Sequence, residues 1–119
     1  MKSRPKIICL CGSTRFTYEM ACLSWMFERD YGYITLGWHF LPEDHPDLKG
    51  EFKGHHAAEN CGKKEHFDEL HKRKIDLADE IFVINKDGYI GESTKSEIEY
   101  AKKQGKIIRY LEETEEVKL

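Results

Sequence analysis

Residues 6–11 (KIICLC) constrain the fold of this chain more than any other segment. Nearly every position in the run is apolar, whereas a strand with one face in water alternates apolar and polar residues. Gly12 follows directly, and glycine permits a tight turn. The segment is therefore predicted to be a strand buried on both faces, as in a parallel sheet that is covered by helices.

Further helices and strands alternate along the rest of the chain. Apolar residues at helical spacing predict three helices, over residues 17–29, 66–78 and 95–104. Apolar and β-branched runs predict three more strands, over residues 33–40, 80–85 and 106–111. Right-handed crossovers between such strands produce a parallel sheet with a ligand crevice at the carboxyl ends of the strands. We therefore predict one α/β domain over residues 1–119, a small Rossmann-like three-layer fold with four to five parallel strands.

A long polar stretch, residues 41–65, separates the second predicted strand from the following helix. It contains two prolines and three glycines and follows neither the helical nor the strand period. Irregular segments of this length in a compact domain are usually functional. We predict a long loop or lid here.

Charge and hydropathy restrict the kind of partner. The formal net charge is -3, so the chain lacks the polycationic surface that drives binding to nucleic-acid phosphates. A small-molecule ligand is expected, and duplex nucleic acid is not. Apolar runs are too short for a membrane span, and the first residues lead into a strand and do not resemble a secretory signal.

Four cysteines are present, and a disulfide framework is one interpretation. Cys9, Cys11 and Cys22, however, fall in a predicted strand and a predicted helix, where small buried thiols pack well. We expect free thiols and, in the absence of an export signal, a cytoplasmic location.

One part of the long loop gathers side chains that commonly bind metals, namely His55, His56, Cys61 and His66. Their spacing matches neither Cys-x-x-Cys nor His-Glu-x-x-His. A structural zinc site is therefore the less favoured alternative. We predict no metal and no cofactor.

The turn after the first strand, Gly12-Ser13-Thr14-Arg15, is the first candidate site. Hydroxyls and backbone N–H groups at a helix N-terminus can hold an anion, and Arg15 can add a charge-assisted contact to a phosphate. The alternative is that Ser13, Thr14 or Thr17 only caps the helix.

The second candidate segment is Gly91 to Glu97, between a strand and a helix. Thr94 and Glu97 have the spacing of a capping box, in which each side chain accepts a hydrogen bond from a free N–H group of the other residue's backbone. On a helical wheel Glu97 lies at the edge of the face that Ile98 turns inward, whereas Glu99 points to solvent. From the spacing alone, helix capping is therefore the favoured role of Glu97, ahead of a role in a site.

The third candidate is the helix that precedes the strand at residues 80–85. His71 and Lys74 lie within its apolar arc, and His71 is closer to the carboxyl edge of the sheet. The alternatives are a hydrogen-bonded core histidine and a lysine whose stem is buried while its charge reaches solvent.

Two parts of the chain resemble the nucleoside 2-deoxyribosyltransferase superfamily, which includes the deoxynucleoside 5'-monophosphate N-glycosidases. One is the early Gly-Ser-x-Arg turn. The other is the apolar strand, the glycine loop and the motif Ser-Thr-x-x-Glu-Ile-x-x-Ala followed by Gly-Lys. The similarity covers roughly residues 1–16 and 70–111, and leaves the long loop unmatched.

The resemblance implies roles for particular residues. Glu97 matches the glutamate nucleophile of the family and Thr94 the threonine before it, while Ser93 stands where glycine is usual. An aspartate often found six residues before the nucleophile is replaced by Gly91, and Glu92 is adjacent to it. His71 aligns with a base-handling aspartate, so it is expected to protonate the departing base.

The Gly-Ser-x-Arg turn is used for the 5'-phosphate in the N-glycosidase branch, which implies that Ser13 and Arg15 bind a nucleotide. The expected function is therefore cleavage or transfer of an N-glycosidic bond of a nucleoside or nucleoside 5'-monophosphate through a carboxylate nucleophile. The alternative is a non-catalytic nucleotide-binding or sensing module of the same fold. Family members commonly self-associate, so a homodimer or higher homo-oligomer is expected.

Overall fold

A computed structural model describes residues 4–41, 46–52, 54 and 56–113. Its sheet is parallel throughout and has the strand order β2-β1-β3-β4. The strands are β1 (Ile7–Gly12), β2 (Ile34–Leu36), β3 (Glu80–Ile84) and β4 (Ile107–Tyr110). The predicted α/β class and parallel sheet are confirmed, with four strands.

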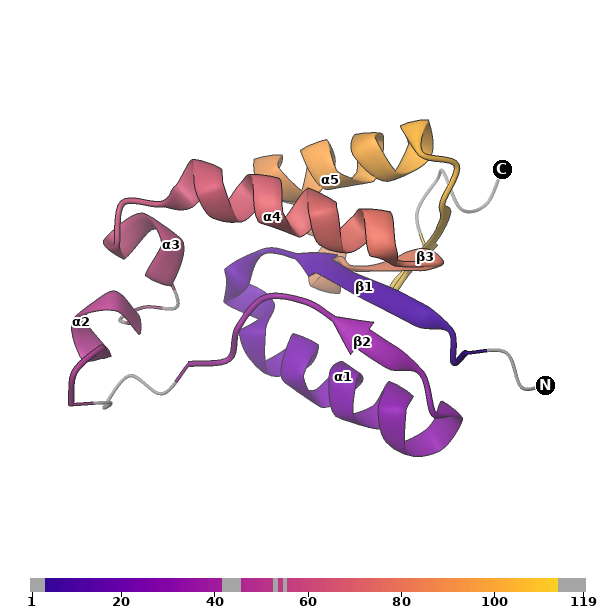
Figure 1. Cartoon of the computed structure of the whole chain (residues 1–119), viewed down its shortest axis with the longest axis horizontal. Coiled ribbons are helices and arrows are strands. Elements are labelled where there is room, and N and C mark those ends of the chain that lie inside the picture. Colours follow the sequence, from indigo (N-terminus) through magenta and orange to yellow (C-terminus); the bar gives the residue numbers. More distant parts are fainter. Residues whose placement is uncertain (1–3, 42–45, 53, 55, 114–119) are drawn as a thin grey trace.

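Helices cover both faces of this sheet (Figure 1). Helix α1 (Thr17–Tyr31) lies on one face, and α4 (Lys64–Leu77) and α5 (Glu92–Lys103) lie side by side on the other. The arrangement is the predicted three-layer, Rossmann-like one. Helix α1 ends at Gly32, whose φ of 68° is the left-handed conformation that glycine adopts readily.

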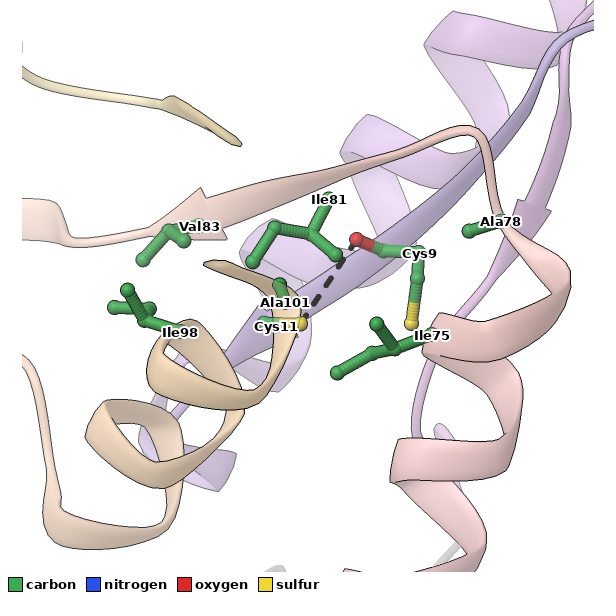
Figure 2. Close-up of a cluster of buried hydrophobic side chains, with 8 residues drawn as sticks. All are labelled: Cys9, Cys11, Ile75, Ala78, Ile81, Val83, Ile98 and Ala101. Atoms are coloured by element: carbon green, nitrogen blue, oxygen red, sulfur yellow. Dashed lines mark hydrogen bonds between the residues drawn. The ribbon is translucent and has the colours of Figure 1, made fainter. Parts of the chain in front are cut away.

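Strand β1 is apolar throughout because its two sets of side chains enter two different cores. Ile8 and Leu10 pack with Met20 of α1. Cys9 and Cys11 point the other way, into a cluster with side chains of α4 and α5 (Figure 2). The period of two along a strand thus places both thiols on the same side of the sheet.

Strand β2 is shorter than the predicted residues 33–40. It pairs with β1 only from Ile34 to Leu36, and the chain then leaves the sheet. The carbonyl of Gly37 accepts a hydrogen bond from Lys74 Nζ at 2.6 Å. The predicted strand was too long because the aromatic residues after Leu36 have high β-propensity. In the structure Trp38 and His39 leave the sheet and line a pocket.

The predicted long loop contains short helical segments. These are α2 (Lys49–Phe52) and α3 (Ala57–Asn60), and α4 begins at Lys64, two residues before the predicted start. Four-residue helices span about one turn, so they produce no recognisable period in a sequence. Residues 42–45, 53 and 55 of this segment lie outside the described residues.

None of the described helices is both long and apolar enough to cross a membrane. The longest of them, α1, has 15 residues, whereas a transmembrane helix needs about 20 apolar ones.

Candidate active site

A pocket of about 560 Å³ opens at the carboxyl end of β1, beside the loop that follows β3. This is the edge of the sheet where the topology predicts a ligand crevice. Seven of the eight predicted site residues line it: Gly12, Ser13, His71, Gly91, Ser93, Thr94 and Glu97. The eighth is Arg15, which is absent from the pocket wall.

Glu97 reaches the pocket because it does not cap its helix. Helix α5 begins at Glu92 with Gly91 as its N-cap residue, and Gly91 makes no side-chain cap. Thr94 therefore lies inside the first turn, where its side chain cannot cap the N-terminus, and the predicted capping box is wrong. The Glu97 side chain instead turns toward the sheet, and the residue is only 8% exposed.

His71 of α4 faces Glu97 across the floor of the pocket. Its Nε2 atom lies 3.7 Å from Glu97 Oε1 and 3.5 Å from the sulfur atoms of both Cys9 and Cys11. The side chain is buried, as the core-histidine interpretation expects, but it also lines the pocket. Lys74 is half-buried and is absent from the pocket lining; its ammonium group donates to the Gly37 carbonyl and is not directed simply to solvent as the alternative expects.

Burial and mutual charge together set the protonation of this pair. Removal from water raises the pKa of Glu97 to about 7, although the positive charge of His71 opposes the effect. Burial lowers the pKa of His71, but the hydrogen bond with Cys9 and the charge of Glu97 outweigh it, so the net pKa is raised. A carboxyl group with a pKa of about 7 beside an imidazole can hold and pass on a proton near neutral pH.

The two thiols beside His71 differ from each other. A hydrogen bond from Cys11, helped by His71, lowers the pKa of Cys9 despite its burial. The pKa of Cys11 is raised, because it donates that bond and lies near the charges of Cys9 and Glu97. The buried cluster behind the pocket therefore favours deprotonation of Cys9 over Cys11.

The turn after β1 combines capping with pocket lining. Ser13 Oγ accepts a hydrogen bond from the backbone N–H of Arg15 at 3.2 Å and so caps the short 3-10 helix η1 (Thr14–Phe16). Thr17 Oγ1 donates to the carbonyl of Thr14 at 2.6 Å. The capping interpretation is confirmed for Ser13, which also faces the pocket, but not for Thr17, since α1 begins after Phe16 without a side-chain cap.

Arg15 lies behind the pocket wall. Its guanidinium carbon is 3.6 Å from the centre of the Tyr89 ring, and Tyr89 lines the pocket. Lys64 lines the pocket. Its ammonium group donates hydrogen bonds to Ser93 Oγ at 2.9 Å and to Asp68 Oδ2 at 2.7 Å. Lys64 was missed because nothing in the sequence connects it with Ser93.

Aromatic side chains form an apolar part of the wall that was also missed: Trp38, His39, Phe67 and Tyr89. Trp38 Nε1 donates a hydrogen bond to Thr17 Oγ1 at 3.0 Å, which orients the indole. Trp38 and His39 fall in the predicted strand 33–40, where the pattern predicts sheet residues and not a pocket wall. Flat rings of this kind stack on nucleobases.

The sequence predicts Cys9 and Cys11 only as buried thiols of the core, but the structure brings both of them to His71. Among the described residues, a group of side chains able to hold a metal consists of these two and His71. The Cys-x-Cys spacing on a strand was the available signal, because it places both sulfurs on one face. Of the loop cluster considered for zinc, His55 lies outside the described residues.

Comparisons with known proteins do not assign this chain to a family. No protein-family profile, no curated protein and no solved structure gives a significant match. The superfamily resemblance therefore stays a prediction that rests on the motifs themselves.

Proposed function

We propose that this protein cleaves or transfers the N-glycosidic bond of a nucleoside or nucleoside 5'-monophosphate, with Glu97 as the nucleophile. The observation that carries the proposal is the placement of Glu97, a buried carboxyl group 3.7 Å from His71 on the floor of a pocket. A residue needed only for capping would lie at the helix surface. Burial of an acid without a structural need is typical of a functional site.

The proposed reaction has two steps. A Glu97 carboxylate oxygen forms a bond to C1' of the sugar as the C1'–N bond breaks, and the electron pair of that bond leaves with the base. Protonated His71 gives its proton to the departing base. Water, or a second base in a transfer reaction, then attacks C1', frees the carboxylate and returns a proton to His71.

The wall of the pocket suits a nucleotide. Its volume of about 560 Å³ is in the usual range for small-molecule sites, roughly 300–1,000 Å³. The rings of Trp38 and Tyr89 offer faces for a base. The first turn of α5, with Ser93 and the ammonium group of Lys64 beside it, offers backbone N–H groups and positive charge for a phosphate.

Chromatography of free base is the direct test. The protein is incubated with a panel of ribonucleosides, deoxynucleosides and their 5'-monophosphates, and at least one is expected to release its base. Glu97→Gln should reduce the rate by a factor of about 1,000 or more, since the nucleophile is lost. Glu99→Gln is the matched control, because Glu99 lies on the same helix with 67% of its side chain exposed.

Two outcomes contradict this function. One is the absence of base release from every substrate, and the other is equal rates for Glu97→Gln and the wild type. A rise in melting temperature with a nucleotide but without base release would instead identify a binding module, because a ligand of the folded state stabilises it.

The homodimer or higher homo-oligomer and the cytoplasmic location remain proposals from the sequence. Trp25 and Met26 on α1 are exposed, at 65% and 44%, which supports self-association through that helix. Sedimentation velocity at micromolar concentration is expected to show a dimer or larger species. A single monomeric species would contradict the proposal.

A further inference from the structure

Three soft metal ligands converge beneath the pocket, and catalysis by Glu97 does not require two of them. Cys9 Sγ and Cys11 Sγ each lie 3.5 Å from His71 Nε2. All three atoms lie within 4.8 Å of one another. Because strand side chains alternate, a Cys-x-Cys pair on β1 sends both sulfurs to the face covered by α4 and α5 (Figure 2).

The distances from His71 Nε2 to the two sulfur atoms agree with those of a zinc site. Zinc binds thiolate sulfur at about 2.3 Å and imidazole nitrogen at about 2.0–2.1 Å, so a tetrahedral ion separates sulfur from nitrogen by about 3.5 Å. That is the distance from His71 Nε2 to each sulfur. Only small side-chain shifts would be needed to bind an ion there.

We propose that Cys9, Cys11 and His71 bind a thiophilic divalent cation of the Zn²⁺ class, with the fourth coordination position left open beside Glu97. Glu97 Oε1 lies 3.7 Å from His71 Nε2 on the pocket side of the cluster. Two thiolates and an imidazole form a three-ligand protein set that zinc accepts, with water or another oxygen in the fourth position.

Packing of small thiols in an apolar core does not by itself account for the cluster. Ile75, Ile98 and Ala101 surround the two cysteines and supply the apolar packing. His71 and Glu97, at 8% exposure each, are polar groups that such a core normally excludes. Both also line the pocket, so the cluster lies directly behind a part of the pocket wall.

Occupancy of this site has a consequence that rests on the proposed function. His71 Nε2 cannot bind a metal and protonate the departing base at the same time, and an ion bound there lies beside Glu97. The bound ion is therefore expected to inhibit base release, and a chelator to restore it. Metal binding itself is independent of whether the protein is a glycosidase.

Cobalt titration is the experiment for the binding claim. Co²⁺ added without oxygen to the metal-free protein is expected to produce a thiolate-to-cobalt charge-transfer band that saturates at one ion per chain and disappears on addition of Zn²⁺. Cys9→Ser and Cys11→Ser should each weaken Zn²⁺ binding by more than the roughly 10- to 100-fold that loss of an outer-shell partner causes. The double variant Cys22→Ser/Cys61→Ser is the matched control, since it removes the other two cysteines.

A second measurement uses only the wild type and so avoids any folding defect of the core variants. X-ray absorption of the zinc-loaded protein is expected to show two sulfur and two nitrogen or oxygen neighbours. The proposal is overturned by the absence of a charge-transfer band, by a band that survives in Cys9→Ser/Cys11→Ser, or by a zinc shell without sulfur. Failure of the glycosidase proposal appears separately, as missing base release from chelator-treated protein.

Discussion

The burial of Glu97 carries a cost in folding free energy. A carboxylate loses favourable hydration when it is buried, and the pKa of Glu97 is raised to about 7 mainly for that reason. His71 offsets only part of this loss, since it carries full charge only when protonated. The folded state therefore becomes less favourable as pH rises from the pKa of a free glutamate, near 4.3, through 7.

This leads to a prediction on stability at high pH. Glu97→Gln removes the charge and keeps the shape, so it is expected to raise the free energy of unfolding at pH 8 by on the order of 2 kcal/mol. The gain should shrink at pH 5, where the wild-type carboxyl is protonated in the folded protein. Urea unfolding at both pH values, with a chelator present, measures the two differences.

Glu99→Gln serves again as the control and is expected to change stability by less than about 0.5 kcal/mol. Equal or lower stability of Glu97→Gln at pH 8 would show that the His71 contact outweighs the burial of the charge.

At the scale of elements, the turn from β1 into η1 depends on a close approach of backbones. A Cβ atom at Gly12 would lie 3.1 Å from the carbonyl oxygen of Ile84, at the end of β3, and 3.3 Å from the Trp38 ring. Glycine is therefore required by space and not by a left-handed backbone conformation, which Gly12 does not adopt. The contact also links the sheet to the aromatic wall of the pocket.

Gly12→Ala is accordingly expected to act on both stability and binding. The extra methyl group must displace either Ile84 or Trp38, which destabilises the protein by about 1–3 kcal/mol and moves the pocket wall. Thermal melting and nucleotide-induced thermal shift would record the two effects. Gly50→Ala is the control, since a Cβ there meets nothing within 4 Å, and a melting temperature for Gly12→Ala equal to that of the control would refute the argument.

At the scale of the whole molecule, an ion pair connects the beginnings of two central strands. Both Asp79 oxygens accept hydrogen bonds from the Arg4 guanidinium at 2.7 Å, and one also accepts the N–H of Ile7 at 2.9 Å. These bonds, the one from Arg4 above all, hold the pKa of Asp79 far below its ordinary value. The contact joins the start of β1 to the residue before β3.

Acid is therefore expected to weaken the fold through Asp79. A carboxyl with a depressed pKa stabilises the folded state above its unfolded pKa, about 3.9, and loses that contribution as pH falls through its folded value. Asp79→Asn should lower the melting temperature at pH 7, and the difference from wild type should shrink between pH 4 and pH 2. Because the Asp79 side chain is 38% exposed, solvent screens the pair and the effect is modest.

Asp30→Asn provides the comparison for this series. Asp30 also pairs with an arginine, but with its neighbour Arg29, so it connects no separate elements. A pH-independent difference for Asp79→Asn, or an equal loss in Asp30→Asn, would contradict the role given to the Arg4–Asp79 pair.

The pattern of apolar residues along the chain was enough to predict the order of helices and strands and the parallel sheet. The apolar runs that became β1 and β3, and the helices between strands, follow from burial and side-chain period, which act within a few residues. The same reasoning placed Gly12, His71 and Glu97 at one edge of the sheet, because parallel topology brings strand ends together. Boundaries were less accurate where an aromatic residue such as Trp38 left the sheet to line the pocket.

The sequence by itself thus determined the layers, the parallel sheet and the edge at which the pocket lies. Only the tertiary structure decided that Glu97 is a buried partner of His71 and not a capping residue, and that Cys9 and Cys11 meet the same imidazole. Those contacts join residues about 26 to 62 positions apart, and no spacing rule describes them. Their geometry depends on how α4 and α5 pack on β1, which is set by the summed contacts of the whole core.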